Sequence, residues 1–291
     1  MSDAAESSES SEWVTRHAVR AACRVRLVGL LVVVALVTGA RHAAAQQPGP
    51  KPVDSISPDK AEFLPRTSFQ LAANSLSGGD PRFTWDARFG GSADVLDYHF
   101  GRLGIVGDYE AVVGSERRNF DVEQGLYILE ASTSGRIGKN ELAMVFHHVS
   151  RHLSDRLKPQ ATAWNVFEVR YLRNLDVSGA QVALVAGAGN VVTHVSVDYT
   201  WNLNIDVAAR HQVSPRVGVY ARGLAEAFGV DPAIRGRTDP QHSGRFEGGV
   251  RLSGRGGVLE LFAGVEHRLD ADLHDYIPVT WGIMGFRLVT K

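Results

Sequence analysis

The sequence predicts an all-β fold, a single antiparallel transmembrane β-barrel of about twelve strands. Three observations predict it. Apolar and polar side chains alternate along one segment after another, and clusters of Gly, Ser, Pro and Asn separate these segments. After residue 45, no apolar run reaches the roughly 20 residues that a membrane-spanning helix needs. A barrel turns only every second residue toward lipid, so a hydrophobic content of 44% is compatible with a membrane protein.

The N-terminus predicts export through the inner membrane. Several arginines precede an apolar segment at 27–37, and the small residues Ala43 and Ala45 follow it. This order predicts a signal peptide over 1–45, with a short membrane anchor as the alternative. The only cysteine, Cys23, lies ahead of the apolar segment, so the exported chain has no disulfide and no thiolate metal site.

Two further regions follow the signal peptide. Residues 46–80 are rich in Pro, Ser and Gly, which predicts a flexible periplasmic lead-in. Residues 81–291 carry the alternating segments and are the predicted outer-membrane barrel. The formal net charge of −1 gives no electrostatic reason to expect nucleic acid as a partner.

Alternation at period 2 predicts eleven strands. They cover 83–89, 103–113, 125–134, 140–150, 163–173, 180–190, 195–208, 215–226, 244–253, 257–268 and 279–289. Bacterial single-chain barrels have even strand numbers, so 93–100 is the predicted twelfth strand. The alternation is clearest from Val195 to Val207, and 229–244 is predicted to be an extracellular loop. The C-terminal segment resembles the closing strand of such barrels, although it ends in Lys291 rather than an aromatic residue.

Three polar side chains are predicted to stand on the lipid-facing wall. His148 and Ser150 share the parity of the apolar residues in 140–150, and Asn165 shares the parity of the apolar residues in the next strand. A polar group facing hydrocarbon is costly unless it has a purpose. This placement favours an enzyme whose substrate is the lipid itself, with Ser150 as nucleophile, His148 as its base and Asn165 orienting the imidazole.

The motif His148-Val149-Ser150, followed after a loop by Trp164-Asn165, resembles outer-membrane phospholipase A. The resemblance covers about residues 140–173. It implies a twelve-stranded barrel, a Ser-His-Asn triad facing the membrane, calcium dependence and activity as a homodimer. Arg151-His152 stands where the family usually has Asn-Gly. Asp155 and Ser154 are the candidate calcium ligands.

Other interpretations stay open. The stretch 147–155 also resembles the H-x-S-S-H-L-x-D signature of an uncharacterised family of predicted outer-membrane proteins. A lipid A deacylase barrel uses His-x-Ser with a glutamate, but Glu168 has the parity of the lumen face. His147 and His148 point to opposite faces and cannot share a zinc ion. The alternative function is a non-catalytic structural or small transport barrel, with Asp198 among its lumen residues.

Overall fold

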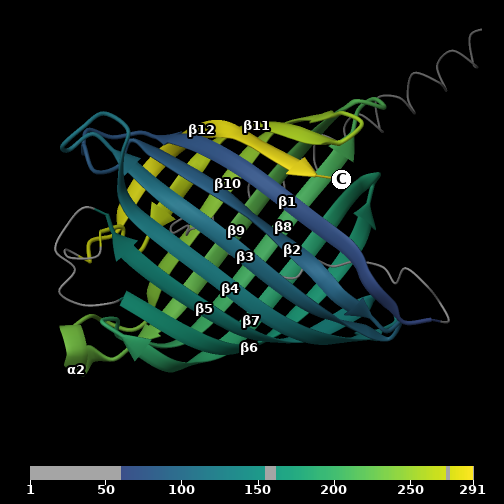
Figure 1. Ribbon diagram of the computed structural model, residues 1–291, viewed down its shortest axis with the longest axis horizontal. Helices are drawn as coiled ribbons and strands as arrows, with labels where there is room; N and C mark the ends of the chain where they lie inside the picture. Colours follow the sequence, from purple (N-terminus) through teal and green to yellow (C-terminus); the bar gives the residue numbers. More distant parts are fainter. Residues whose placement is uncertain (1–59, 155–161, 273–275, 291) are drawn as a thin grey trace, which may run out of the picture. The chain divides into compact units, whose positions relative to one another are not determined.

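The computed structural model describes residues 60–154, 162–272 and 276–290. Twelve antiparallel strands form a closed barrel in which each strand pairs with the next and β1 pairs with β12 (Figure 1). The strands are β1 Glu62–Leu76, β2 Trp85–Asp97, β3 Gly101–Gly114, β4 Asp121–Ile137, β5 Asn140–Leu153, β6 Thr162–Val177, β7 Ala180–Val195, β8 Tyr199–Gln212, β9 Val217–Val230, β10 Gln241–Ser253, β11 Gly257–Arg268 and β12 Val279–Thr290. The predicted fold class and strand number are confirmed.

Helical structure is minor in the part of the chain that the structure describes. A short helix, α2 Pro232–Arg235, lies in the connection between β9 and β10 and is capped by the Asp231 side chain at its N-terminus. In the described ranges no helix has the length and apolar character needed to cross a bilayer.

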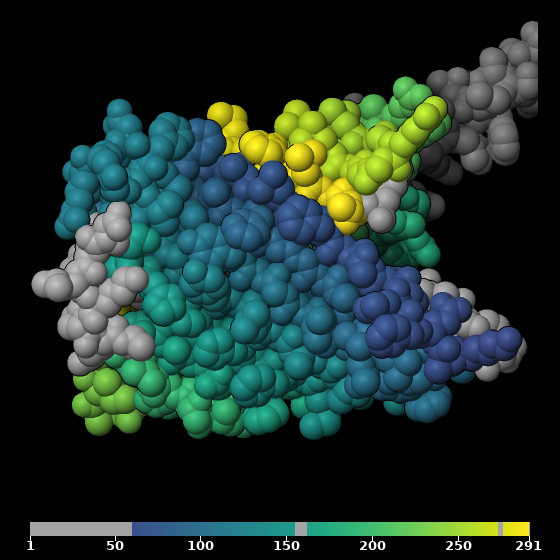
Figure 2. Space-filling view, viewed as in Figure 1, coloured from purple at the N-terminus to yellow at the C-terminus, as the bar shows by residue number. Residues whose placement is uncertain are grey.

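The outer wall of the barrel is apolar. Along β5, Leu142, Met144 and Phe146 have exposed fractions of 47%, 64% and 38%, while the residues between them are buried. The same alternation on the other strands exposes Phe69, Leu71, Phe89, Ile105, Leu129, Phe167, Val169, Leu203, Ile205, Leu261, Met284 and Leu288. In Figure 2 the side chains form a continuous surface over the strands coloured blue to teal. Such a belt of apolar side chains is the surface that lipid requires of a membrane barrel.

Buried ion pairs fill the inner face of the wall. Arg170 lies 2.7 Å from Glu130 and 2.8 Å from Glu168, and all three side chains are almost fully buried. Arg268 lies 2.6 Å from Glu266 in a second group. Buried charges are stable only when they are paired, and these strands supply both signs at matching heights.

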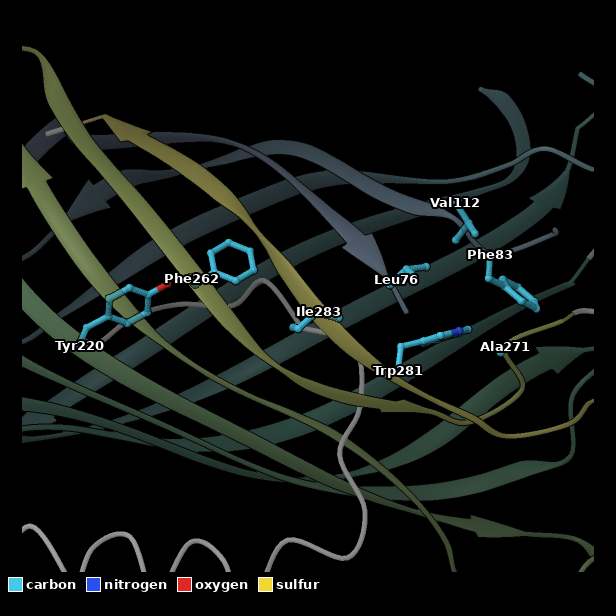
Figure 3. Packing of buried hydrophobic residues seen from close by; sticks show 8 residues of the cluster. All are labelled: Leu76, Phe83, Val112, Tyr220, Phe262, Ala271, Trp281 and Ile283. Carbon is cyan, nitrogen blue, oxygen red and sulfur yellow. The ribbon is translucent and has the colours of Figure 1, made fainter. Parts of the chain in front are cut away.

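An apolar cluster lies inside the barrel beside these ion pairs. It contains Leu76, Phe83, Val112, Tyr220, Phe262, Ala271, Trp281 and Ile283 (Figure 3). The rings of Phe83 and Trp281 are 5.2 Å apart, and both belong to the end of the barrel where the longer connections lie. The first connection, between β1 and β2, is therefore held against the last strand.

The two ends of the barrel differ. Short turns join β2 to β3, β4 to β5 and β6 to β7 at the end where the chain enters β1 and leaves β12. Gly138 and Gly179 adopt positive φ values of 60° and 82° in two of these turns, a conformation that favours glycine. The longer connections lie at the other end. In outer-membrane barrels the short turns face the periplasm and the long loops face the outside.

The start of the barrel differs from the prediction. The first strand begins at Glu62, inside the segment predicted as a flexible lead-in, so the barrel does not begin at residue 81. The predicted strands 83–89 and 93–100 are the two halves of β2, and β1 completes the set of twelve. β1 is hard to recognise because its lumen-facing positions mix Ala with polar residues and because Pro65 lies at a register shift. The predicted signal peptide over 1–45 lies outside the described residues and stays a prediction.

The segment with the clearest alternation is also different from the prediction. Residues 195–208 are not one strand, because β7 ends at Val195 and β8 begins at Tyr199. Ser196 has a φ of 57°, which turns the chain between the two strands. Tyr199 is 4% exposed and points inward, where its hydroxyl donates to Asp270 at 2.5 Å. The period-2 pattern continued through a turn, so it could not show where the strand ended.

Candidate functional site on the outer wall

The structure places the three predicted polar residues on the outer wall, near the end with the longer connections. His148 and Ser150 alternate with the buried Val149 on β5. Asn165 lies on the same face of β6 and is the direct register partner of His148. The parity argument from sequence therefore describes the two strands correctly.

His148 and Asn165 are joined by a hydrogen bond. The Nδ1 atom of His148 lies 2.7 Å from Oδ1 of Asn165. An amide oxygen only accepts, so Nδ1 carries a proton in this bond, and in the neutral imidazole the free electron pair is on Nε2. Asn165 is itself oriented by a second bond, in which its Nδ2 donates to Oγ1 of Thr193 on β7 at 2.6 Å. Thr193 is a polar residue of the site that sequence reasoning missed.

Ser150 is bonded to a different histidine. Its Oγ lies 2.8 Å from Nε2 of His152, two residues further along β5. Although all of these side chains lie in the described part of the chain, no hydrogen bond joins Ser150 to His148. The structure therefore brings together two pairs, His148 with Asn165 and Ser150 with His152. His152 has the same parity as Ser150, and that signal was available in the sequence.

An aromatic row continues from Ser150 around the outer wall. Phe89, Tyr109 and Tyr127 are successive register partners on β2, β3 and β4, and Tyr127 is the partner of Ser150. The Phe89 and Tyr109 rings are 5.2 Å apart, and the Tyr109 and Tyr127 rings are 4.8 Å apart. The Tyr127 ring also meets the His152 ring edge-on at 5.6 Å. These rings form an aromatic patch on the outer wall beside Ser150.

The structure assigns lumen positions to two other residues considered from sequence. His147 is 2% exposed and bonds Glu130 at 2.6 Å through Nδ1. Glu168 is 3% exposed and accepts a hydrogen bond from Arg170 at 2.9 Å. Neither residue can take part in chemistry on the outer wall.

The candidate calcium ligands are described only in part. Ser154 follows the last residue of β5, and its backbone N–H donates to the Glu123 carbonyl oxygen at 3.0 Å. Asp155 lies outside the described residues. Among the residues that are described, no group of three or more His, Cys, Asp or Glu side chains could hold a metal ion. The calcium site stays a prediction.

A polar pair on the outer wall is not unique to this place. His267 on β11 is half-buried and Thr280 on β12 is exposed, and Nδ1 of His267 lies 2.7 Å from Oγ1 of Thr280. Like His148 and Asn165, this pair joins a ring Nδ1 to a side-chain oxygen across two neighbouring strands. The His267–Thr280 pair is therefore a control position, against which the effect of substitutions at His148 can be compared.

Comparisons with known proteins give a general likeness in fold. No protein-family model matches the sequence, and no curated protein matches it. Outer membrane phospholipase A from Escherichia coli is 11% identical, with a TM-score of 0.48 over 79% of this chain and 98% of that chain. LpxR from Salmonella typhimurium is 7% identical, with a TM-score of 0.46 over 77% of this chain and 99% of that chain. CdiB from Escherichia coli is 11% identical, with a TM-score of 0.42 over 79% of this chain and 63% of that chain. These structural neighbours are outer-membrane β-barrels, and at such low identities and TM-scores their activities do not transfer to this chain.

Proposed function

We propose that this protein is an outer-membrane hydrolase that cleaves acyl esters of membrane phospholipids. In this proposal Ser150 is the nucleophile, His148 the general base and Asn165 the residue that orients the base. One observation carries it: the hydrogen bond of 2.7 Å from His148 Nδ1 to Asn165 Oδ1 on the lipid-facing wall. In the neutral imidazole this bond requires the proton on Nδ1, so that the free electron pair is on Nε2, two residues from a serine on the same face.

The chemistry follows from these roles. Ser150 Oγ attacks the ester carbonyl carbon while Nε2 of His148 takes the hydroxyl proton. The tetrahedral intermediate then breaks its bond to the glycerol oxygen, which receives that proton and leaves as an alcohol. Water next attacks the acyl-serine, again giving a proton to His148, and the fatty acid leaves as Ser150 recovers its proton. The imidazole takes a proton in each attack and gives it up when each intermediate breaks down, so both the acylation and the deacylation end with a neutral imidazole.

The level of the site on the barrel supports a lipid ester as the substrate. Ser150 lies three residues from the end of β5 at Leu153, its register partner is Tyr127, and the exposed apolar Phe146 lies four residues before it. The ester groups of a phospholipid lie between headgroup and hydrocarbon, which is the level that aromatic residues occupy in membrane barrels. A soluble substrate would have no reason to meet this face.

The bond from Ser150 to His152 fits the proposal as a resting arrangement. His148 and His152 flank Ser150 at equal sequence distance on one face of β5. Rotation about the Ser150 Cα–Cβ bond moves its hydroxyl between staggered positions and so away from His152. In the proposal the hydroxyl turns toward His148 when substrate arrives.

The proposal includes the outer membrane as location, membrane lipids as partners, a homodimer as the active form and calcium as a requirement. Calcium prefers oxygen ligands, which Ser154 and Asp155 both offer. A resident calcium ion at the site would supply positive charge for the oxyanion of the intermediate.

The test compares wild type with Ser150→Ala. Fatty acid release from phospholipid in mixed detergent micelles is measured with calcium and with a chelator. We expect the variant to lose release by at least about a hundredfold, because a nucleophile cannot be replaced by methyl. Equal release from the two proteins would remove the enzyme interpretation. If wild type releases fatty acid equally with calcium and with chelator while Ser150→Ala does not, only the calcium requirement is rejected.

The second candidate is a non-catalytic barrel, which the His267–Thr280 pair favours because it shows that outer polar pairs also occur away from the site. A structural barrel would release no fatty acid in either form, and a small transport barrel would in addition give conductance steps in a planar bilayer. Absence of release together with such steps would establish the transport function.

A further inference from the structure

A groove runs over the outer wall, on the side of the candidate site that is nearer the short turns. It has a volume of about 470 Å³, and its walls are Met144, Phe167 and Val169 on one side and Trp201 and Leu203 on the other. All of these belong to β5, β6 and β8, so the groove lies over β7. Met144, Phe167 and Leu203 are 64%, 56% and 48% exposed, which shows that the groove faces outward.

The groove exists because β7 has small side chains where its neighbours have large ones. Ala188 is the register partner of Val169 on β6 and of Leu203 on β8, and it forms the floor. The lumen-facing neighbours of Ala188 are Gly187 and Gly189. A Cβ on Gly189 would lie 2.7 Å from the Phe167 carbonyl oxygen, so there is no space for a side chain at this position.

The end of the groove nearer the longer connections lies next to the register partners His148, Asn165 and Thr193. Asn165 pairs with Thr193, and the next outward residues toward the short turns are Phe167 and then Val169. Each step of two residues along a strand covers about 7 Å. The groove therefore begins one step from Asn165 and continues toward the end of the barrel that carries the short turns.

We infer that this groove binds the acyl chain of the lipid whose ester lies at Ser150; the inference rests on the function proposed above. A phospholipid of the outer leaflet has its headgroup at the loop end, and its chains run toward the middle of the bilayer. From Ser150 that direction leads past His148 and Phe146 to the groove over Ala188. The occupant is a long, flexible hydrocarbon chain, because the large outward side chains of the walls are apolar and lie within the lipid belt. The exposed polar side chain among the lining residues is Asn190, the register partner of Phe167 and Trp201, at the end of the groove nearer the candidate site.

A substitution that fills the groove tests the inference. Ala188→Phe puts a ring on the floor, and Ala263→Phe makes the same change at an outward position of β11, away from the groove. Hydrolysis of dipalmitoyl and dihexanoyl phosphatidylcholine is measured for the full chain in micelles. We expect Ala188→Phe to lower the ratio of long-chain to short-chain kcat/KM by about tenfold or more. Ala263→Phe should leave that ratio as in wild type. Equal ratios in all three proteins would overturn the inference while leaving the hydrolase intact.

A binding measurement separates failure of the groove from failure of the enzyme. Ser150→Ala protein in phosphatidylcholine vesicles is irradiated with a phosphatidylcholine that carries a diazirine near the end of one acyl chain. We expect more label per residue on 186–190 than on the outward residues of 261–265, and Ala188→Phe should remove the excess. Equal labelling of the two segments would overturn the groove, whether or not wild type releases fatty acid.

Discussion

Replacing each of the two histidines that flank Ser150 separates the base from the resting partner. If His148 is the base, His148→Ala should lower kcat/KM by about 10²–10⁴, because this is the range that a positioned general base contributes. In free energy the loss is ~3–5 kcal/mol of transition-state stabilisation. Asn165→Ala should act in the same direction, since it leaves the imidazole without the partner on Nδ1.

His152→Ala should have the opposite effect. The hydrogen bond of 2.8 Å between Ser150 and His152 must break before the hydroxyl can turn to His148. A neutral hydrogen bond contributes about 0.5–1.5 kcal/mol net, so removing it should raise kcat/KM by about two- to twelvefold. The assay is fatty acid release from mixed micelles at saturating calcium. His267→Ala, on β11 away from the site, is the control and should match wild type.

The reverse order of effects would refute this reasoning. If His152→Ala lost about a hundredfold or more while His148→Ala kept near wild-type kcat/KM, Ser150 and His152 would be the working pair. The His148–Asn165 bond would then be a structural contact only. Heat-dependent gel mobility confirms that each variant forms the barrel before its rate is compared.

Three other predictions concern the wall and its support. Arg170→Met should lower the free energy of unfolding by about 3–5 kcal/mol in denaturant titrations from vesicles, because two buried carboxylates lose their cation; a change below 1 kcal/mol would contradict the paired lumen. Met144→Arg should destabilise the inserted barrel by about 2–4 kcal/mol, whereas Phe63→Arg, near the short-turn end of β1, should cost about 0–1 kcal/mol. Equal costs at the two sites would place the hydrocarbon belt elsewhere. Thr193→Val should lower kcat about five- to tenfold with KM unchanged, because it frees the amide that orients His148; an unchanged kcat would remove Thr193 from the site.

The fold and the wall were predictable because parity is a local property. Period 2 alone assigned His148, Ser150 and Asn165 to the outer face, and all three lie there. The strand number followed from adding one strand to an odd count, although the missing strand was β1 and not 93–100. Parity fails where the chain turns without breaking its pattern, as it does at Ser196.

The contacts within the site were less predictable, because they depend on register and rotamers. Thr193 reaches Asn165 only because β6 and β7 pair with a shift between Asn165 and Val166, which no local pattern encodes. The choice of Ser150 between its two flanking histidines depends on a side-chain torsion. The sequence identified the candidate site residues, but the strand register determines which of them are in contact.

The ion pairs inside the barrel also constrain how this protein can change over time. Each buried arginine serves more than one carboxylate, as Arg170 serves Glu130 and Glu168. Replacing one member leaves a buried charge without its partner. Variants that remain stable should therefore change an arginine and its carboxylates together. In homologous sequences the lumen positions should therefore covary in sets across neighbouring strands, while the lipid-facing positions drift freely among apolar residues.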